Sequence, residues 1–265
     1  MAKSKTSSNL SDDYSRLGYR RFVAWPARIR REGPLLLRSL RNAPGRRVLD
    51  LGCASGEHSR FLAEEGFSVV GVDQSETSLA LARDVESRGE VRYVQGDLRD
   101  LDRLVPPGFD GAICLGNTLV HLVAERDLSR ALEALASVLV EGGVLLFQIL
   151  NYHRLRETQS RYLPLNFVPE EGGDRVFLRL MDFREDGRVL FCPTTLEFRP
   201  DEPHPVRVLE SRSVELRGWE REELLELLGE AGFRVTALLG DMSGRPFVVS
   251  ESNDLIVVAE RRRGE

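Results

Sequence analysis

The sequence predicts an α/β fold with a doubly wound, mostly parallel seven-stranded sheet and a small antiparallel β insertion after the fifth strand. Three observations lead to this prediction. Apolar runs alternate with helix-like stretches between residues 47 and 151, which is typical of βα units with right-handed crossovers. A polar residue stands at or just after the end of each run. The pattern changes after Asn151: strand-like alternation begins at Arg175, and the α/β pattern resumes near residue 217.

We therefore expect three regions within the 265 residues. Residues 1–45 form an N-terminal helical cap. Residues 46–152 and 217–265 form the main domain. Residues 153–216 form an antiparallel insertion that acts as a lid.

The cap begins with a polar stretch over residues 1–13, which we expect to be a loose tail. A helical pattern runs from Tyr14 to Arg41. Pro26 and Pro34 are expected to divide it, because proline removes a helical hydrogen bond and clashes with the preceding turn.

The buried strands of the main domain are expected where the apolar runs lie. Between them we expect helices at Glu57–Glu65, after the capping residue Ser75, and at Glu125–Val140. The five predicted strands are Arg47–Leu51, Ser68–Val72, Val91–Val94, Phe109–Leu115 and Val144–Leu150.

The second half of the chain is expected to begin with irregular structure over residues 153–172. A hairpin with a turn at Asp186-Gly187 follows, then one further insertion strand, a helix and two closing strands. In chain order these are Arg175–Arg184, Val189–Phe198, Val206–Leu216, the helix Trp219–Ala231, Phe233–Leu239 and Leu255–Glu260.

The polar residues at the strand ends are expected to meet, because the carboxyl ends of parallel strands share one edge of the sheet. Doubly wound sheets bind their ligands beyond that edge. The five residues are Asp50, Asp73, Asp97, Asn117 and Asn151.

The stretch Val48–Ser59 combines a buried strand, two glycines four residues apart and a helix start. Such a loop presents bare backbone N–H groups and a positive helix end to a ligand. The spacing Gly52-x-x-x-Gly56 is neither the dinucleotide pattern nor a Walker loop. Asp73, at the end of the second strand, can accept both hydroxyls of a ribose.

Composition excludes some function classes. The net charge of −5 gives no support to nucleic-acid binding. The three cysteines have no metal-binding spacing, which predicts no metal site and indicates a reducing compartment. No signal-peptide core and no apolar run of about 18 residues is present, so we expect a cytoplasmic protein without a membrane partner.

The segments Val48–Gly56, Val72–Ser75 and Gly96–Leu98 resemble the cofactor motifs of class I S-adenosylmethionine (SAM)-dependent methyltransferases. A narrower likeness lies in Phe109–Leu122 and in Asn151-Tyr152, which are similar to glycine/sarcosine N-methyltransferases. The resemblance implies a Rossmann-like fold whose last strand is antiparallel, SAM as the cofactor, and methyl transfer to a small molecule.

The resemblance also implies roles for individual residues. The donor's carboxylate would pair with Arg28, its ribose would bind Asp73 and Gln74, and its adenine would lie between Asp97 and Leu98. The remaining cofactor-binding residues would be Asp50, Gly52, Ala54, Gly56 and Leu115. The catalytic residues, facing the methyl group and the acceptor, would be Asn117, His121 and Asn151.

One position departs from the glycine enzymes. Where they carry an arginine that binds the substrate carboxylate, just before the asparagine after strand five, this chain has Leu150. Glycine is therefore a doubtful acceptor, and another amine is favoured. Four arginines nearby could replace the missing one: Arg154, Arg161, Arg175 and Arg179.

Three alternatives stay open from the sequence. The first is O-methylation with His121 as general base, although a structural or orienting role for this histidine is favoured. The second is a non-catalytic SAM-binding protein, and the third is a nicotinamide dehydrogenase. We expect His58 to be solvated or to cap its helix, and Tyr14 and Tyr19 either to cover the site or to pack elsewhere. The sequence leaves a homo-oligomer open.

Overall fold

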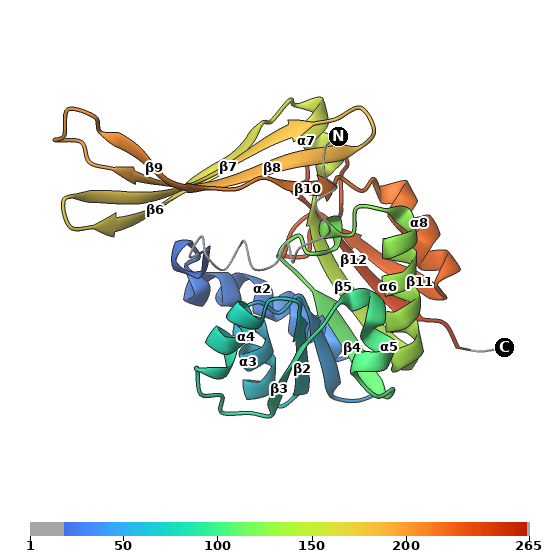
Figure 1. Cartoon of the computed structure of the whole chain (residues 1–265). Coiled ribbons are helices and arrows are strands. Elements are labelled where there is room, and N and C mark those ends of the chain that lie inside the picture. The colour runs from blue at the N-terminus through green and yellow to red at the C-terminus, as the bar shows by residue number, and fades with distance from the viewer. Residues whose placement is uncertain (1–18, 264–265) are drawn as a thin grey trace, which may run out of the picture.

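The computed structural model describes residues 19–263, which form two sheets (Figure 1). The larger sheet has seven strands in the order β11-β12-β5-β4-β1-β2-β3. Only β12 in this sheet runs against its neighbours. The predicted fold class is confirmed. The strands are β1 (Arg47–Leu51), β2 (Ser68–Asp73), β3 (Val91–Gln95), β4 (Phe109–Cys114), β5 (Leu139–Leu150), β11 (Phe233–Leu239) and β12 (Asp254–Arg261).

Helices cover both faces of this sheet. One face packs against α2 and α3 through a cluster that includes Leu36 and Leu62. The opposite face packs against α5, α6 and α8, with Leu132 and Leu228 in the core. No helix within residues 19–263 has the length and apolarity to cross a membrane. The helices are η1 (Tyr19–Phe22), α2 (Trp25–Leu40), α3 (Glu57–Glu64), α4 (Glu76–Arg83), η2 (Leu98–Asp100), α5 (Leu101–Leu104), η3 (Leu119–His121), α6 (Glu125–Val138), α7 (Tyr152–Glu157) and α8 (Arg221–Glu230).

The second sheet, here called the lid sheet, forms an arm that projects from the body (Figure 1). Its strand order is β10-β8-β7-β6, and β9 also pairs with β8. Buried Met181, Val189 and Phe191 join its base to the main core. Its strands are β6 (Tyr162–Glu170), β7 (Gly173–Phe183), β8 (Arg188–Phe198), β9 (Val206–Ser211) and β10 (Val214–Arg217).

The prediction of irregular structure over residues 153–172 is wrong. Asn151 caps the short helix α7, and β6 follows as a strand paired with β7. Pro164 and Pro169 obscured the alternation of β6 in the sequence. Because β6 is an edge strand, it tolerates proline, which lacks the N–H that an inner strand must donate.

Two smaller expectations are also corrected. Pro34 lies inside the continuous helix α2, whereas Pro26 stands in its first turn, where a missing N–H costs nothing. The expected strand Val206–Leu216 is two strands, β9 and β10, which pair with successive parts of β8. The start of the predicted N-terminal helical pattern, including Tyr14, lies outside the described residues.

Candidate active site

A cavity of about 1340 Å³ opens at the carboxyl edge of the large sheet and extends to the lid sheet. This volume exceeds the roughly 300–1,000 Å³ of an ordinary single-ligand pocket, so the cavity has room for two reactants. Gly56 and Asn151 do not line it. The other predicted residues do: Arg28, Asp50, Gly52, Ala54, Asp73, Gln74, Asp97, Leu98, Leu115, Asn117 and His121.

The loop between β1 and α3 adopts left-handed backbone conformations at alternate positions. The φ angles are 70° at Gly52, 47° at Ala54 and 76° at Gly56. A Cβ atom added to Gly52 would lie 2.5 Å from Cγ2 of Thr118, so two constraints select glycine there. Ala54 carries the strained conformation without being glycine, a feature typical of ligand-binding loops.

Asp73 fixes this loop from the neighbouring strand. One carboxylate oxygen accepts a hydrogen bond from the backbone N–H of Ala54 at 2.8 Å, and the other accepts one from Ser75 at 2.9 Å. Ser75 in turn caps α4 as predicted, accepting from the N–H of Ser78. Asp73 therefore connects the glycine loop to the adjoining helix start while it faces the cavity.

Asp50, at the end of β1, is 2% exposed. Its carboxylate accepts a hydrogen bond from the Ser59 hydroxyl at 2.6 Å. Burial raises the pKa of Asp50, an effect that the positive field of His58 and the Ser59 hydrogen bond only partly offset.

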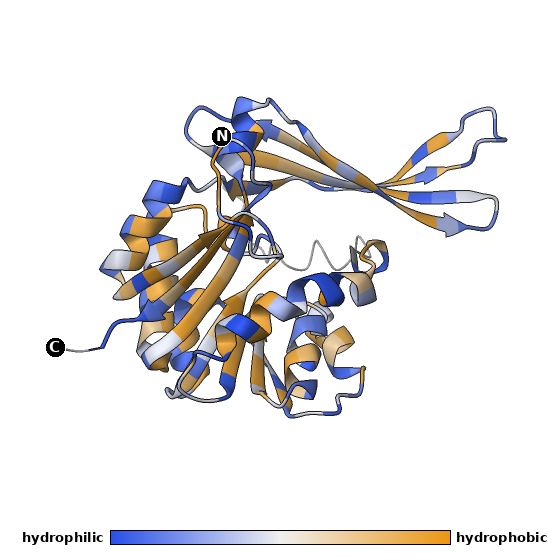
Figure 2. Ribbon diagram, turned by 180° about the vertical axis from the view of Figure 1, so that it is seen from behind, coloured by the Kyte–Doolittle hydropathy of each residue, from blue (hydrophilic) through white to orange (hydrophobic). Residues whose placement is uncertain are grey.

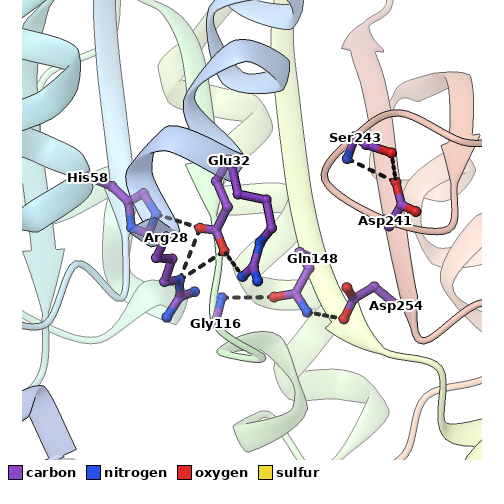
Figure 3. Close-up of polar contacts among 9 residues, drawn as sticks. Arg28, Glu32, His58, Gly116, Gln148, Asp241, Ser243 and Asp254 are labelled. Carbon is purple, nitrogen blue, oxygen red and sulfur yellow. Dashed lines mark hydrogen bonds and ion pairs between the residues drawn. The ribbon is translucent and has the colours of Figure 1, made fainter. Parts of the chain in front are cut away.

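Arg28 is held by Glu32, one helical turn later on α2 (Figure 3). The Nε of Arg28 donates to both carboxylate oxygens, at 2.9 and 3.0 Å. His58 contacts the same carboxylate through Nε2 at 2.7 Å. Burial alone would raise the pKa of Glu32, but the His58 hydrogen bond and the Arg28 charge outweigh it and lower the value to about 2.

The geometry leaves the Nη end of Arg28 directed toward the cavity. Its Nη2 lies 3.7 Å from the point where a Cβ on Gly116 would stand, at the end of β4. The expectation for His58 is wrong, because the side chain is buried against Glu32 and Trp25. Sequence reasoning missed Glu32, although its i, i+4 spacing from Arg28 was a usable signal.

A second network supports the loop after β4 (Figure 3). The backbone N–H of Gly116 donates to Oε1 of Gln148 at 3.0 Å. The Nε2 of Gln148 donates to Asp254 on β12 at 2.7 Å. Burial raises the pKa of Asp254, with the Gln148 hydrogen bond acting against it. This chain of contacts spans three strands, and no local pattern in the sequence indicated it.

Asn117 bridges the ends of β4 and β5. Its backbone is left-handed, with φ of 68°. The side-chain Nδ2 of Asn117 donates to the Tyr152 hydroxyl at 2.8 Å, and the side-chain Oδ1 accepts from the backbone N–H of Leu150 at 3.0 Å. Asn117 thus reaches the cavity with its side chain held in place.

Asn151 lies beside this bridge but away from the cavity, and it is 3% exposed. The side-chain Oδ1 of Asn151 accepts a hydrogen bond from the backbone N–H of Arg154 at the start of α7. Its amide donates to the carbonyls of Val249 and Ser252 at 2.8 and 2.9 Å. These contacts are those of a helix cap that also anchors the loop before β12.

His121 ends the short helix η3 and lines the cavity. Burial lowers its pKa to about 4, because the charged imidazolium is poorly solvated there. The imidazole is therefore neutral at neutral pH. A neutral imidazole whose conjugate acid is this strong is a weak proton acceptor.

Asp97 and Leu98 follow β3. Both Asp97 oxygens accept from Arg99, the shortest contact being 2.6 Å to Nη2. Burial would raise the pKa of Asp97, but the hydrogen bonds from Arg99 outweigh it and the pKa is lowered. Leu98 is 9% exposed and offers an apolar surface beside this carboxylate.

Two of the four candidate arginines line the cavity, Arg175 and Arg179, both on β7. Arg175 contacts Glu170 at 2.8 Å. Arg179 donates to the carbonyl of Pro164 and to Asn166 at 2.6 and 2.7 Å.

The other two candidate arginines are not among the residues that line the cavity. Arg154 donates to Asn253 at 3.1 Å, and Arg161 pairs with Asp182 at 2.9 Å. Leu150, at the position of the missing arginine, does line the cavity.

The helical cap meets the lid sheet over this cavity. The rings of Phe22 and Phe177 stack with centroids 5.0 Å apart and planes 20° apart. Both residues line the cavity. The contact joins η1 to β7 at the wall of the cavity.

Comparison with known proteins agrees with this site. Residues 48–143 match the family model described as a methyltransferase domain. This chain contains a methyltransferase domain. The domain spans β1 to β5 and so includes the glycine loop, Asp73 and the loop after β4.

Individual relatives extend the likeness. The chain is 42% identical over 142 residues to a glycine/sarcosine N-methyltransferase of Parasynechococcus marenigrum, covering 53% of this chain and 50% of that protein. The chain spans about half the length of the curated relatives it matches.

Solved structures cover nearly the whole chain. A SAM-dependent methyltransferase of Clostridium acetobutylicum has a TM-score of 0.73 at 16% identity, covering 95% of this chain and all of that one. A sugar N-methyltransferase from a Streptoalloteichus species has a TM-score of 0.66 at 26% identity, covering 99% of each chain. The fold is that of SAM-dependent methyltransferases, and the resemblance to this class is confirmed.

Proposed function

We propose that the protein transfers a methyl group from SAM to the nitrogen of a small-molecule amine. The observation that carries this proposal is the single cavity in which the strand-end residues of the methyltransferase domain face the inner side of the lid sheet. One end offers a site for the donor and the other a site for the acceptor. Such proximity is the main contribution a protein makes to a direct displacement.

The residues of the domain end fit SAM. The left-handed glycine loop leaves space close to the backbone. Asp73 supplies a carboxylate that accepts hydrogen bonds, and Arg28 supplies a positive charge at a separate point. Arg28 would bind the donor's carboxylate through its Nη groups. Asp73 and Gln74 would bind the ribose, and Asp97 and Leu98 the adenine. The methionine part would lie along Asp50, Gly52, Ala54 and Leu115, and Gly56 would support the loop at the start of α3.

Bound SAM supplies a methyl group on a positively charged sulfur that is already a good leaving group. The residues of this chain then have to align the acceptor, exclude water and keep the amine unprotonated. A cavity closed by the lid sheet favours the neutral amine, because desolvation disfavours the ammonium form. Asn117, fixed by Leu150 and Tyr152, would orient the acceptor.

The environment of His121 favours N-methylation over O-methylation. A hydroxyl acceptor needs a base with a pKa near the working pH, whereas the pKa of His121 is lowered to about 4. A neutral His121 can still accept a hydrogen bond from an amine and orient it. We therefore assign His121 an orienting role.

The class of amine stays broad. Relatives are named for glycine and sarcosine, and one solved neighbour is named for a sugar. Leu150 removes the arginine expected for an amino-acid carboxylate, while Arg175 and Arg179 bring positive charge from the lid.

A transfer assay tests the proposal. The full chain is incubated with methyl-labelled SAM and separate panels of amines (glycine, sarcosine, amino sugars) and hydroxyl compounds, and products are read by mass spectrometry. We expect labelled product with at least one amine, and a loss of turnover in Asn117→Ala. Labelling of hydroxyl compounds alone, or SAM binding with no transfer to any panel member, would contradict it.

A further inference from the structure

Gln148 is the only polar residue in the apolar run from Val144 to Leu150. This run belongs to β5, inside the large sheet, whose strands are mainly hydrophobic (Figure 2). A polar side chain in such a strand costs free energy unless it is hydrogen-bonded. The partners of Gln148 therefore indicate why a polar residue stands there.

Gln148 accepts hydrogen bonds from two consecutive residues of the loop after β4. Its side-chain Oε1 accepts from the backbone N–H of Gly116 at 3.0 Å, and its main-chain carbonyl accepts from that of Asn117 at 3.3 Å. Both loop residues are left-handed, with φ of 71° and 68°. Because a left-handed asparagine costs free energy, the conformation persists only where surrounding contacts enforce it. Gln148 supplies two of these contacts.

Asp254 fixes the direction in which the Gln148 amide points (Figure 3). Gln148 lies opposite Ile256 on β12, so Asp254, two residues away, is its diagonal neighbour on the same face of the sheet. A carboxylate accepts hydrogen bonds, and the Nε2 of Gln148 donates to it at 2.7 Å. The other end of the amide, Oε1, is thereby left for Gly116.

The loop held in this way stands between the proposed positions of the two reactants. Toward the donor, the Nη2 of Arg28 lies 3.7 Å from the point where a Cβ on Gly116 would stand. Toward the acceptor, Asn117 lines the cavity with its side chain fixed by Leu150 and Tyr152. A misplacement of about 1 Å between reacting groups costs roughly 100-fold in rate, so the position of this loop matters for methyl transfer.

We propose that Gln148 is a positioning residue for methyl transfer. It fixes the turn at Gly116 and Asn117, and with it the position of the acceptor relative to the donor, while Asp254 orients its amide. This role rests on the proposed function, because Asn117 is taken to orient the acceptor and Arg28 to bind the donor. Its signature is a loss of turnover without a comparable loss of SAM binding.

An exchange of the amide and the acid tests this role kinetically, with the amine found in the transfer assay. Gln148→Glu removes the Nε2 donor and sets two carboxyl groups against each other, so kcat should fall roughly 10- to 100-fold. The dissociation constant for SAM should stay close to that of the wild type. Gln148→Glu combined with Asp254→Asn restores one amide and one carboxylate in reversed places, and it should recover most of the lost kcat. Gln159→Glu is the control, because it adds the same charge at an exposed residue that does not line the cavity.

Hydrogen-exchange NMR adds a readout that needs no acceptor. The Gly116 amide should exchange faster in Gln148→Glu and return toward the wild-type rate in the double variant. The Gly108 amide, which donates to the Val138 carbonyl just before β4, should not change in either. Circular dichroism melting identifies a variant that fails to fold. Gln148→Met then replaces Gln148→Glu, since methionine keeps the chain length and loses both side-chain hydrogen bonds.

Four results would overturn the proposal. Wild-type exchange at Gly116 in Gln148→Glu would show that the side chain does not hold the loop. Faster exchange with an unchanged kcat would show that the loop does not set the rate. A double variant as slow as Gln148→Glu would assign the effect to charge in the cavity, and a loss of SAM binding as large as the loss of kcat would make Gln148 a donor ligand. If the wild type methylates no amine, the proposed function fails, and the exchange rates alone decide whether Gln148 holds the loop.

Discussion

Both carboxylate oxygens of Glu32 accept hydrogen bonds from the Nε of Arg28, at 2.9 and 3.0 Å. These contacts leave the Nη end of the guanidinium directed toward the loop after β4. Glu32 is 4% exposed, and His58 supplies a further contact to it, so the pair is fixed by packing as well as charge. In the proposed site, Glu32 is a positioning residue for the group that binds the donor's carboxylate.

Glu32→Gln should therefore weaken SAM binding. Losing one charge-assisted contact costs about 1.5–3 kcal/mol, which corresponds to roughly a 10- to 150-fold rise in the dissociation constant. Calorimetric titration with SAM measures it. Arg31→Ala is the control, because Arg31 contacts Glu32 at 3.1 Å but is 67% exposed, and it should change binding little. Equal losses in both variants would contradict the role of Glu32.

Gly52→Ala should disturb the loop through both backbone strain and a clash with Thr118. Gly187→Ala is a matched control, because Gly187 also has a left-handed φ, 80°, but has no atom within 4 Å of its Cβ position. We expect both variants to lose about 1 kcal/mol of unfolding free energy from strain. Only Gly52→Ala should also lose SAM binding. Unimpaired SAM binding in Gly52→Ala would show that the loop does not hold the donor.

His121 should make stability depend on pH. Its pKa is lowered from 6.5 to about 4 in the folded state, so the unfolded chain binds the proton more readily. Stability should therefore fall as pH decreases from about 6.5 to 4 and should not depend on His121 above 6.5. Melting curves of wild type and His121→Gln across this range measure it. The melting temperature of the wild type should fall relative to that of His121→Gln as pH decreases. A difference between the two melting temperatures that does not change with pH would refute the lowered pKa.

Leu150→Arg should shift the acceptor preference toward amines with a carboxylate. Leu150 lines the cavity next to Asn117, so an arginine there could reach an acceptor held by that residue. We expect kcat/KM for glycine or sarcosine to rise relative to an uncharged amine. Leu150→Met controls for size without charge. A Leu150→Arg variant that folds and binds SAM but shows no shift would contradict the placement of this residue.

The sequence predicted the large sheet well because its strands are buried on both faces and appear as apolar runs, as in Val69–Val72. It failed at β6, where Pro164 and Pro169 hide an edge strand. At the site, the strand-end carboxylates Asp50 and Asp73 could be located from topology alone.

Side-chain contacts could not be located in this way. Glu32 becomes significant only when α2 packs beside His58, and Gln148 only when β12 places Asp254 next to β5. Asn151 occupies the expected strand end, yet its helix-capping contacts turn it away from the cavity. Sequence spacing fixes which edge a residue reaches, whereas packing decides which way its side chain points.

We infer that the glycine loop and Asp73 hold a methyl donor rather than a dinucleotide. Titration calorimetry of the wild type and Asp73→Ala with SAM and with NADH tests it most directly. We predict one SAM site in the wild type, much weaker SAM binding in Asp73→Ala, and no NADH binding in either. Tight NADH binding without SAM binding in the wild type would contradict the account.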